Sequence, residues 1–323
     1  IHSSILCCTR TVIDASLFFL QLKIKPNLIY YFSSKGDQWW DPWKNSKDIV
    51  EPLRYFASQV VCLRIDKCLL SDVLNQINII DYSYVRMLKL CQLNTTQLDV
   101  IQAHNFPYLE HLSLIETLDF SLKILCQFKS LHSCEIQSIK IDTNYLTISS
   151  SSIQSMFLRQ CHPQDMHTFL HHFPTMMSFQ VMIYLSNSFA DKTGSFVNFI
   201  HPNLESIYIH VLDIDSRTNE TSYDKYNILN GLLMTISFNK PIRYILSLVD
   251  SINFDFEQFQ HIIRKLNFVR LSCQMMWHHK FVTAPNIDSI RQIPLFNQLE
   301  ILLDNSRVLF CRAVWRKTSI SNH

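Results

Sequence analysis

A repeated pattern of apolar residues is the feature that most constrains what this chain can fold into. In each unit an apolar residue stands at positions 1, 4 and 6, and a small or apolar residue stands at position 9. Seven consecutive units begin 22–28 residues apart, and their positions 4 and 6 are Leu63 and Ile65, Leu88 and Leu90, Leu112 and Leu114, Cys134 and Ile136, Met156 and Leu158, Phe179 and Val181, and Ile207 and Ile209. Three weaker units follow, with Leu246 and Leu248, Val269 and Leu271, and Leu299 and Ile301. Such a period is typical of arrays in which each unit buries its apolar face against its neighbours.

Prolines support the same register. Pro107, Pro174 and Pro202 each stand two residues before position 1, and two further prolines precede Arg243 and Phe296 in the same way. Because proline cannot continue a helix and favours extended backbone before it, each unit is expected to turn into a strand at the same phase. Positions 4 and 6 then lie on one side of that strand. Helical patterns predict the returning segments at 96–104, 164–172 and 255–266, the last with Asp255 as its N-cap.

The period and the form L-x-x-L-x-L-x-x-(N/C)-x-L resemble leucine-rich repeats. This resemblance implies an α/β leucine-rich-repeat solenoid, with a curved parallel sheet on the concave face and helices on the convex face. The repeat domain is expected at 60–303, after an N-terminal cap at 1–59 and before a C-terminal cap or tail at 304–323. In the N-terminal cap, Leu20, Leu22 and Ile24 predict an opening strand.

Cysteine at position 9, as at Cys68 and Cys161, resembles the repeats of leucine-rich-repeat F-box proteins. Residues 5–18 are similar to the last helix of an F-box, and the matching positions are Leu6, Cys7, Arg10, Ile13 and Phe18. The earlier F-box helices, which start with a Leu-Pro motif, would lie upstream of Ile1. The resemblance implies a substrate-recognition subunit of a cullin-type ubiquitin ligase. Its F-box would bind a Skp-type adaptor and its concave face would bind the protein substrate, with no catalytic residue or cofactor of its own.

Two other functions remain open at this point. One is a free-standing leucine-rich-repeat scaffold or inhibitor without a role in ubiquitin transfer. The other is an extracellular glycosylated receptor, because Asn94 and Asn219 each begin an Asn-x-Thr acceptor sequence. The residues upstream of Ile1 would distinguish the three functions.

Composition excludes several classes of protein. The chain has three glycines where average usage of about 7% would give about twenty, so it cannot assemble a phosphate-binding loop or a nucleophile elbow. With a net charge of +2, nucleic acid is not expected as a partner. The ten cysteines form no C-x-x-C pair, which favours reduced thiols in the cytoplasm or nucleus. No apolar run is long enough to predict a membrane span.

The concave face would expose positions 5 and 7 of each strand. On this basis we predict a protein-binding surface, because extended concave faces serve binding in repeat proteins and aromatic and arginine side chains are enriched at interface centres. The predicted residues are Arg64, Lys89, Glu135, Phe157, Arg159, Met182, Tyr208, His210 and Arg270.

A group of histidines near Cys161 suggests zinc as an alternative. His167 and His171 stand four residues apart on the predicted helix, beside His162 and His172. However, Thr168 stands where a metalloprotease helix carries glutamate, and Cys161 is expected to point inward. We therefore expect no metal and interpret the histidines as a solvated helix face.

Overall fold

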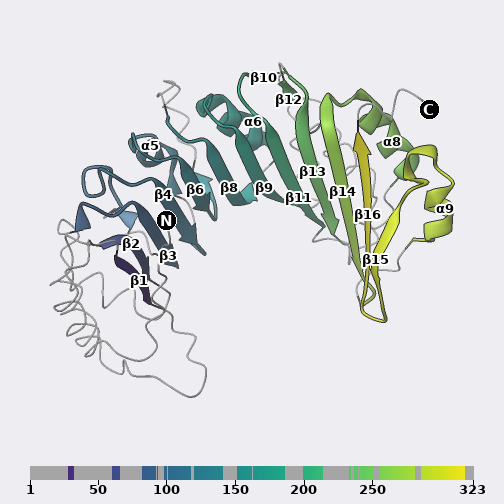
Figure 1. Ribbon diagram of the computed structural model, residues 1–323, viewed down its shortest axis with the longest axis horizontal. Coiled ribbons are helices and arrows are strands. Elements are labelled where there is room, and N and C mark those ends of the chain that lie inside the picture. Colours follow the sequence, from purple (N-terminus) through teal and green to yellow (C-terminus); the bar gives the residue numbers. More distant parts are fainter. Residues whose placement is uncertain are drawn as a thin grey trace. The chain divides into compact units, whose positions relative to one another are not determined.

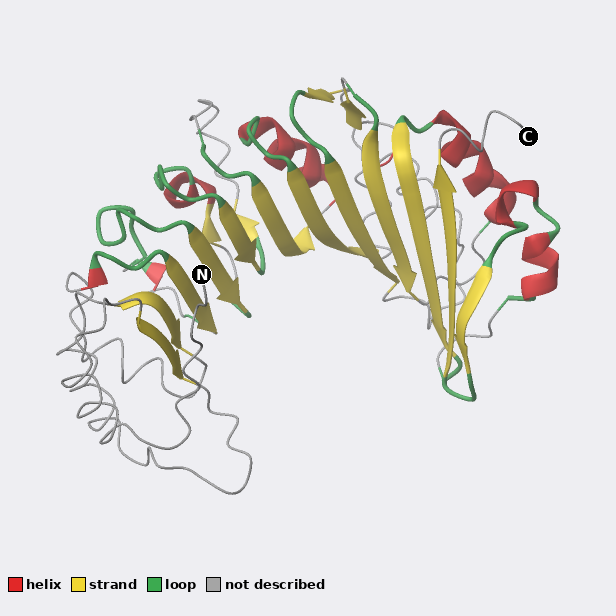
Figure 2. Ribbon diagram, viewed as in Figure 1, coloured by secondary structure: helices red, strands yellow, loops and turns green. Residues whose placement is uncertain are grey.

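The computed structural model describes residues 28–32, 60–65, 82–91, 93, 98–99, 101–117, 120–140, 151–161, 163–185, 199–213, 233, 236–238, 240–249, 255–280 and 285–316. The chain forms two compact units, Ile1–Thr147 and Ile148–His323. Both are of the α/β type, with a mostly parallel sheet and few helices (Figures 1 and 2).

The sheet of the first unit is parallel. Its neighbouring strands are, in order, β1 (Leu28–Phe32), β2 (Val60–Ile65), β3 (Met87–Cys91), β4 (His111–Ile115) and β6 (Ser133–Ile136). A second, two-stranded sheet joins β5 (Phe120–Ser121) to β7 (Ile139–Lys140), and the short helix α5 (Leu122–Leu125) lies between them in sequence. The register pairs Leu63 with Leu88, Leu88 with Leu112, and Leu112 with Cys134. The predicted alignment of position 4 in these four sequence repeats is therefore confirmed.

The sheet of the second unit is parallel except at one edge (Figure 2). The parallel strands are, in order, β8 (Ser155–Cys161), β9 (Ser178–Leu185), β11 (Ser206–Asp213), β13 (Ile242–Val249) and β14 (Phe268–His278). β16 (Val308–Arg316) pairs antiparallel with β14, and β15 (Glu300–Asp304) pairs antiparallel with β16 at the edge. A separate parallel pair joins β10 (Phe199–His201) to β12 (Ile236–Phe238).

Two of the three predicted helices are confirmed. α6 (Pro163–His172) and α8 (Phe256–Lys265) match the patterns at 164–172 and 255–266. The Asp255 side chain accepts a hydrogen bond from the backbone N–H of Gln258 at 2.9 Å, as an N-cap does. The helix expected at 96–104 is wrong in its described second half. Residues 103–105 form a turn there, in which Asn105 and Phe106 both donate to the carbonyl of Gln102.

The end of the second unit has an aromatic core. Phe296 lies in the 3-10 helix η4 (Pro294–Phe296), just after α9 (Ile287–Arg291), and is fully buried. Its ring centroid is 5.2 Å from that of Phe256 on α8 and 5.2 Å from that of Trp315 on β16, both edge to face. The Trp315 indole N–H donates to the carbonyl of Leu295 at 2.6 Å. This cluster packs α8 and η4 against the antiparallel edge.

An aromatic residue three places before position 1 anchors the turn into the strand, a feature that the sequence analysis missed. Tyr82, Phe106, Phe128 and Phe173 hold this place, and each is at most 3% exposed. The backbone N–H at position 1 donates to the aromatic residue's carbonyl in three of these turns, at Tyr82, Phe106 and Phe173. In each of these turns a buried aromatic residue thus fixes the entry into the strand.

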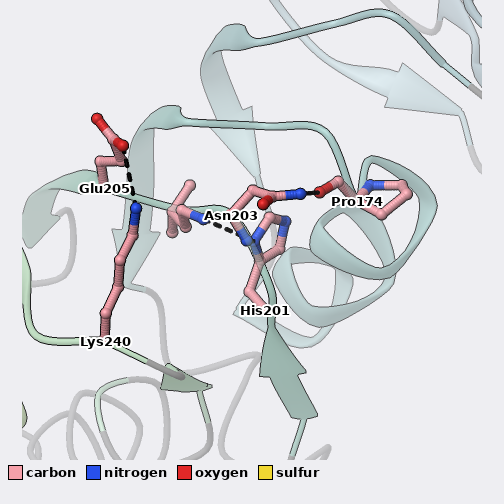
Figure 3. A network of polar contacts seen from close by, with 6 residues as sticks. Pro174, His201, Asn203, Glu205 and Lys240 are labelled. Carbon is pink, nitrogen blue, oxygen red and sulfur yellow. Dashed lines mark hydrogen bonds and ion pairs between the residues drawn. The ribbon is translucent and has the colours of Figure 1, made fainter.

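His201 replaces the aromatic residue in the unit that leads into β11 (Figure 3). It is 1% exposed, and its Nδ1 accepts hydrogen bonds from the backbone N–H groups of Asn203 and Leu204, at 3.3 and 3.0 Å. Its Nε2 lies 3.1 Å from the carbonyl oxygen of Phe173, and the Asn203 amide donates to the carbonyl of Pro174 at 2.8 Å. Since Nδ1 is an acceptor, the ring proton lies on Nε2 and is donated to Phe173. Burial lowers the pKa of this histidine below its ordinary value of 6.5.

The eighth sequence repeat, on β13, is shifted by two residues from the register that the sequence predicts. Ile209, at position 6, pairs with Leu246, which was expected at position 4. Leu246 and Leu248 are still buried as expected, because a shift of two residues returns every side chain to the same face.

The ninth and tenth sequence repeats differ further from the prediction. In the ninth, Leu271 is buried as predicted, but Val269 is 54% exposed, because the register shifts between β13 and β14 at this point and Phe268 is buried in its place. Ile301 is 42% exposed, so the tenth unit is wrong as a parallel repeat: its strand, β15, is antiparallel and lies at the sheet edge. Nine residues of the segment expected as a cap or tail form β16 inside this sheet.

Candidate functional site

The exposed face of the second unit's sheet carries three rows of side chains that run across the strands. Residues two apart in a strand share a face, and the register places their equivalents side by side on the next strand. The position-3 row contains Ser155, Ser178, Ser206, Arg243, Arg270 and Arg316. The position-5 row contains Phe157, Gln180, Tyr208, Ile245, Ser272 and Val314. The position-7 row contains Met182, His210, Ser247, Gln274 and Arg312.

A hollow of about 360 Å³ lies among these rows, on β9, β11, β13 and β14, which are neighbours in Figure 1. It is lined by Ser178, Gln180, Ser206, Ile207, Tyr208, Ile245 and Gln274. Of these, Tyr208 is half-buried, whereas Ile245 is 39% exposed. The hollow therefore combines an aromatic ring and an exposed aliphatic chain with neutral hydrogen-bonding groups, a lining suited to binding rather than to acid–base chemistry.

His210 stands beside the hollow. Its ring centroid is 6.3 Å from that of Tyr208, and its buried Nδ1 has no hydrogen-bond partner among the described residues. Burial lowers the pKa of His210 below 6.5, so the ring is neutral at neutral pH. Neither a carboxylate nor a nucleophilic hydroxyl is recorded at hydrogen-bond distance from this ring in the described ranges, as a catalytic pair would require.

Phe157 and Arg159 lie on β8 of the same unit. The Arg159 guanidinium carbon is 5.3 Å from the centroid of the Phe157 ring, which is a cation–π arrangement. Both side chains are half-buried, so an aromatic and a cationic group are held in one fixed place on the strand.

The structure brings together part of the predicted binding surface. Phe157 and Tyr208 lie in the position-5 row, Met182 and His210 pair directly across β9 and β11, and Arg270 lies in the position-3 row. Sequence reasoning missed Arg243, which was treated only as an interruption of position 1. It also left out the neutral lining residues Ser178, Ser206, Ile245 and Gln274. Arg243 and Ile245 were not predicted because the eighth sequence repeat is shifted by two residues. This shift is a matter of pairing between strands, which the sequence of one repeat does not determine.

The other three predicted residues belong to the first unit. Arg64, Lys89 and Glu135 occupy one row, with Ser113 between the last two. The Ser113 hydroxyl donates to Oε2 of Glu135 at 2.8 Å. Glu135 is therefore held within its own sheet.

Position 9 has the structural role that its burial implies. Thr117 is fully buried, and its Oγ1 accepts a hydrogen bond from the backbone N–H of Leu93 at 3.1 Å. It donates to the carbonyl of Ile115 at 3.3 Å. Thr117 thereby joins the ends of two neighbouring sequence repeats within the first unit.

The histidine group near Cys161 is described in part. Cys161 is buried, which raises the pKa of its thiol, with a smaller contribution from Asp165. The expectation of a solvated face is wrong for His172, which is 6% exposed; burial, and then His171, lowers its pKa. His171 is exposed, His162 lies outside the described residues, and the side chain of His167 is not described. No group of three or more potential ligands is placed to hold a metal ion in the described segments.

Several sequence features lie outside the described residues. They are the F-box-like segment 5–18, the predicted strand at 20–24, Cys68, and the acceptor residues Asn94 and Asn219. Among the helices that the structure does describe, none has the length and apolarity needed to cross a membrane.

Comparison of the chain with protein-family models, with curated proteins and with solved structures finds no match. The exposed face of the second unit is therefore the feature from which a function can be inferred.

Proposed function

We propose that this protein is a protein-recognition module that binds its partner on the exposed sheet face of the second unit. The observation that carries this proposal is the hollow lined by Tyr208, where a half-buried aromatic ring and the exposed aliphatic chain of Ile245 stand beside neutral polar groups. Interface centres are enriched in such aromatic residues, and the surrounding polar groups confer orientation.

The finer proposal is a leucine-rich-repeat solenoid that serves as the substrate receptor of a cullin-type ubiquitin ligase. The repeat spacing and the aligned columns of apolar residues support the first part, and the F-box-like residues 5–18 support the second. In that role the protein would bind the substrate and would not itself catalyse ubiquitin transfer.

One measurement tests the role in a ubiquitin ligase, and a second tests the binding face of the second unit. Purified full-length protein should co-elute with a purified Skp-type adaptor, and a variant lacking residues 5–18 should not. If the intact protein never associates with the adaptor, the ubiquitin role is refuted and a free-standing scaffold replaces it. Tyr208→Ala should weaken substrate binding without weakening adaptor binding, whereas Tyr84→Ala, which removes an exposed tyrosine of the first unit, should affect neither.

A further inference from the structure

Three arginines stand side by side on the exposed face of the second unit. Arg243 on β13 pairs in register with Arg270 on β14, which pairs in turn with Arg316 on β16. All three side chains are exposed. Neighbouring strands are about 4.8 Å apart, so the row concentrates positive charge at one end of the strands.

Like charges directly opposite each other in a sheet are destabilising. In the described part of the chain no carboxylate forms an ion pair with Arg243 or Arg270. The next residues of the row are Ser206 and Ser178, whose hydroxyls bond each other at 3.2 Å. Glu205 is adjacent in sequence to this row, but its carboxylate is bound to Lys240 at 3.0 Å (Figure 3). The repulsion between the two guanidinium groups is thus not relieved by the protein's own described acids.

The arginine row adjoins the hollow. Ser178 and Ser206 belong both to the position-3 row and to the lining of the hollow, and Ile245 is two residues from Arg243. Successive rows on one face are separated by two residues, or about 6.8 Å. One ligand can therefore reach the apolar lining and the guanidinium groups together.

We propose that this face binds an acidic polypeptide segment of a partner protein. One apolar or aromatic side chain of the segment occupies the hollow beside Tyr208 and Ile245, and carboxylates within about two residues of it bind Arg243 and Arg270. Arginine suits this role because its planar guanidinium binds a carboxylate through two hydrogen bonds. This inference rests on the proposed function, and it adds the chemistry of the partner.

The charge of this face suits a polypeptide better than a nucleic acid. The net charge of the chain is only +2, and the position-7 row ends in Arg312, whose guanidinium is bound to Glu300 at 2.8 Å. A phosphate backbone requires a broad field of unpaired cations, whereas the arginine row is short and borders a neutral, partly apolar hollow.

The test is selection from a displayed library of random dodecapeptides on the full chain. The selected pool is expected to be enriched in Asp and Glu next to an aromatic or aliphatic residue. The variant Arg243→Gln/Arg270→Gln should bind this pool about tenfold more weakly, as loss of charge-assisted hydrogen bonds predicts. The matched control is Arg264→Gln/Lys265→Gln, which removes the same charge from exposed positions on α8 and should leave binding unchanged.

The outcomes separate the two proposals. A selected pool without acidic enrichment, whose binding is still lost in Tyr208→Ala, overturns the acidic partner and leaves the binding face intact. A pool that is insensitive to Tyr208→Ala and to the arginine variant overturns both, and so does a failure to select any peptide. If a double-stranded oligonucleotide displaces the pool and binds more tightly than it, the acidic polypeptide is refuted in favour of a phosphate ligand.

Discussion

Replacement of His201 by phenylalanine should change how the stability of the protein depends on pH. In the folded chain Nδ1 accepts two backbone N–H groups, so a proton cannot be added there without breaking both hydrogen bonds. The unfolded chain has no such restriction and takes up a proton as the pH falls below 6.5. The stability that the neutral ring contributes is therefore complete above that pH and is lost on acidification.

The size of the effect follows from linkage. One histidine whose pKa is lowered on folding costs at most about 1.4 kcal/mol of unfolding free energy between about pH 7.5 and about pH 5.5. At neutral pH His201→Phe should be less stable than the original protein by about 1–3 kcal/mol, because the carbonyl of Phe173 loses its donor. The Leu204 N–H can still donate to the carbonyl of residue 201, as the equivalent amides do at Phe106 and Phe173. The difference between the two proteins should shrink as the pH falls.

Urea unfolding followed by circular dichroism at several pH values measures this difference. His279→Gln, which removes an exposed histidine, is the control for the loss of a histidine side chain as such. His172 and His210 also have lowered pKa values and contribute to acid destabilisation, but they are present in both proteins and cancel in the comparison. Parallel stability curves for His201→Phe and the original protein would refute the assigned role of Nδ1.

Three other substitutions test the packing and capping of the fold, each by urea unfolding. Thr117→Val should cost about 1–3 kcal/mol, because the Leu93 N–H loses its acceptor. Asp255→Ala should cost about 1 kcal/mol through loss of the cap on α8. Phe296→Ala should cost about 3–5 kcal/mol, because this fully buried ring joins α8 to β16.

Each substitution has its own control. Thr117→Ser keeps the acceptor and should retain most of the stability that valine loses; equal losses would mean that the hydroxyl is unimportant. Asp255→Asn keeps the cap and should be nearly neutral. Phe296→Leu keeps most of the volume, so a loss as large as that of alanine would contradict a packing role.

The sequence predicted the strands well where the repeat is strict. Positions 4 and 6 are buried and aligned from Leu88 to Cys134 in the first unit, and from Met156 to Ile209 in the second. These positions obey a rule of alternation that each strand carries in its own residues. The cap at Asp255 was also predictable, because a helix N-terminus is stabilised by residues a few places away in sequence.

The candidate site was predictable only in part. Tyr208, Met182 and His210 follow from alternation within their own strands, and they lie on the expected face. Arg243 could not be placed from the sequence, because its neighbour Arg270 is determined by the pairing of β13 with β14 and by the register shift at Val269. The hollow likewise requires four strands at once.

The sequence by itself determined which residues of the regular units are buried, since period and alternation are local properties of the chain. Only the tertiary structure decided that β16 returns antiparallel beside β14, that Ile301 lies exposed at the edge, and that two arginines meet on one face. The physical reason is that pairing and register are settled by contacts between strands far apart in sequence. A shift of two residues there leaves every side chain on the same face of the strand, yet it changes which side chains become neighbours.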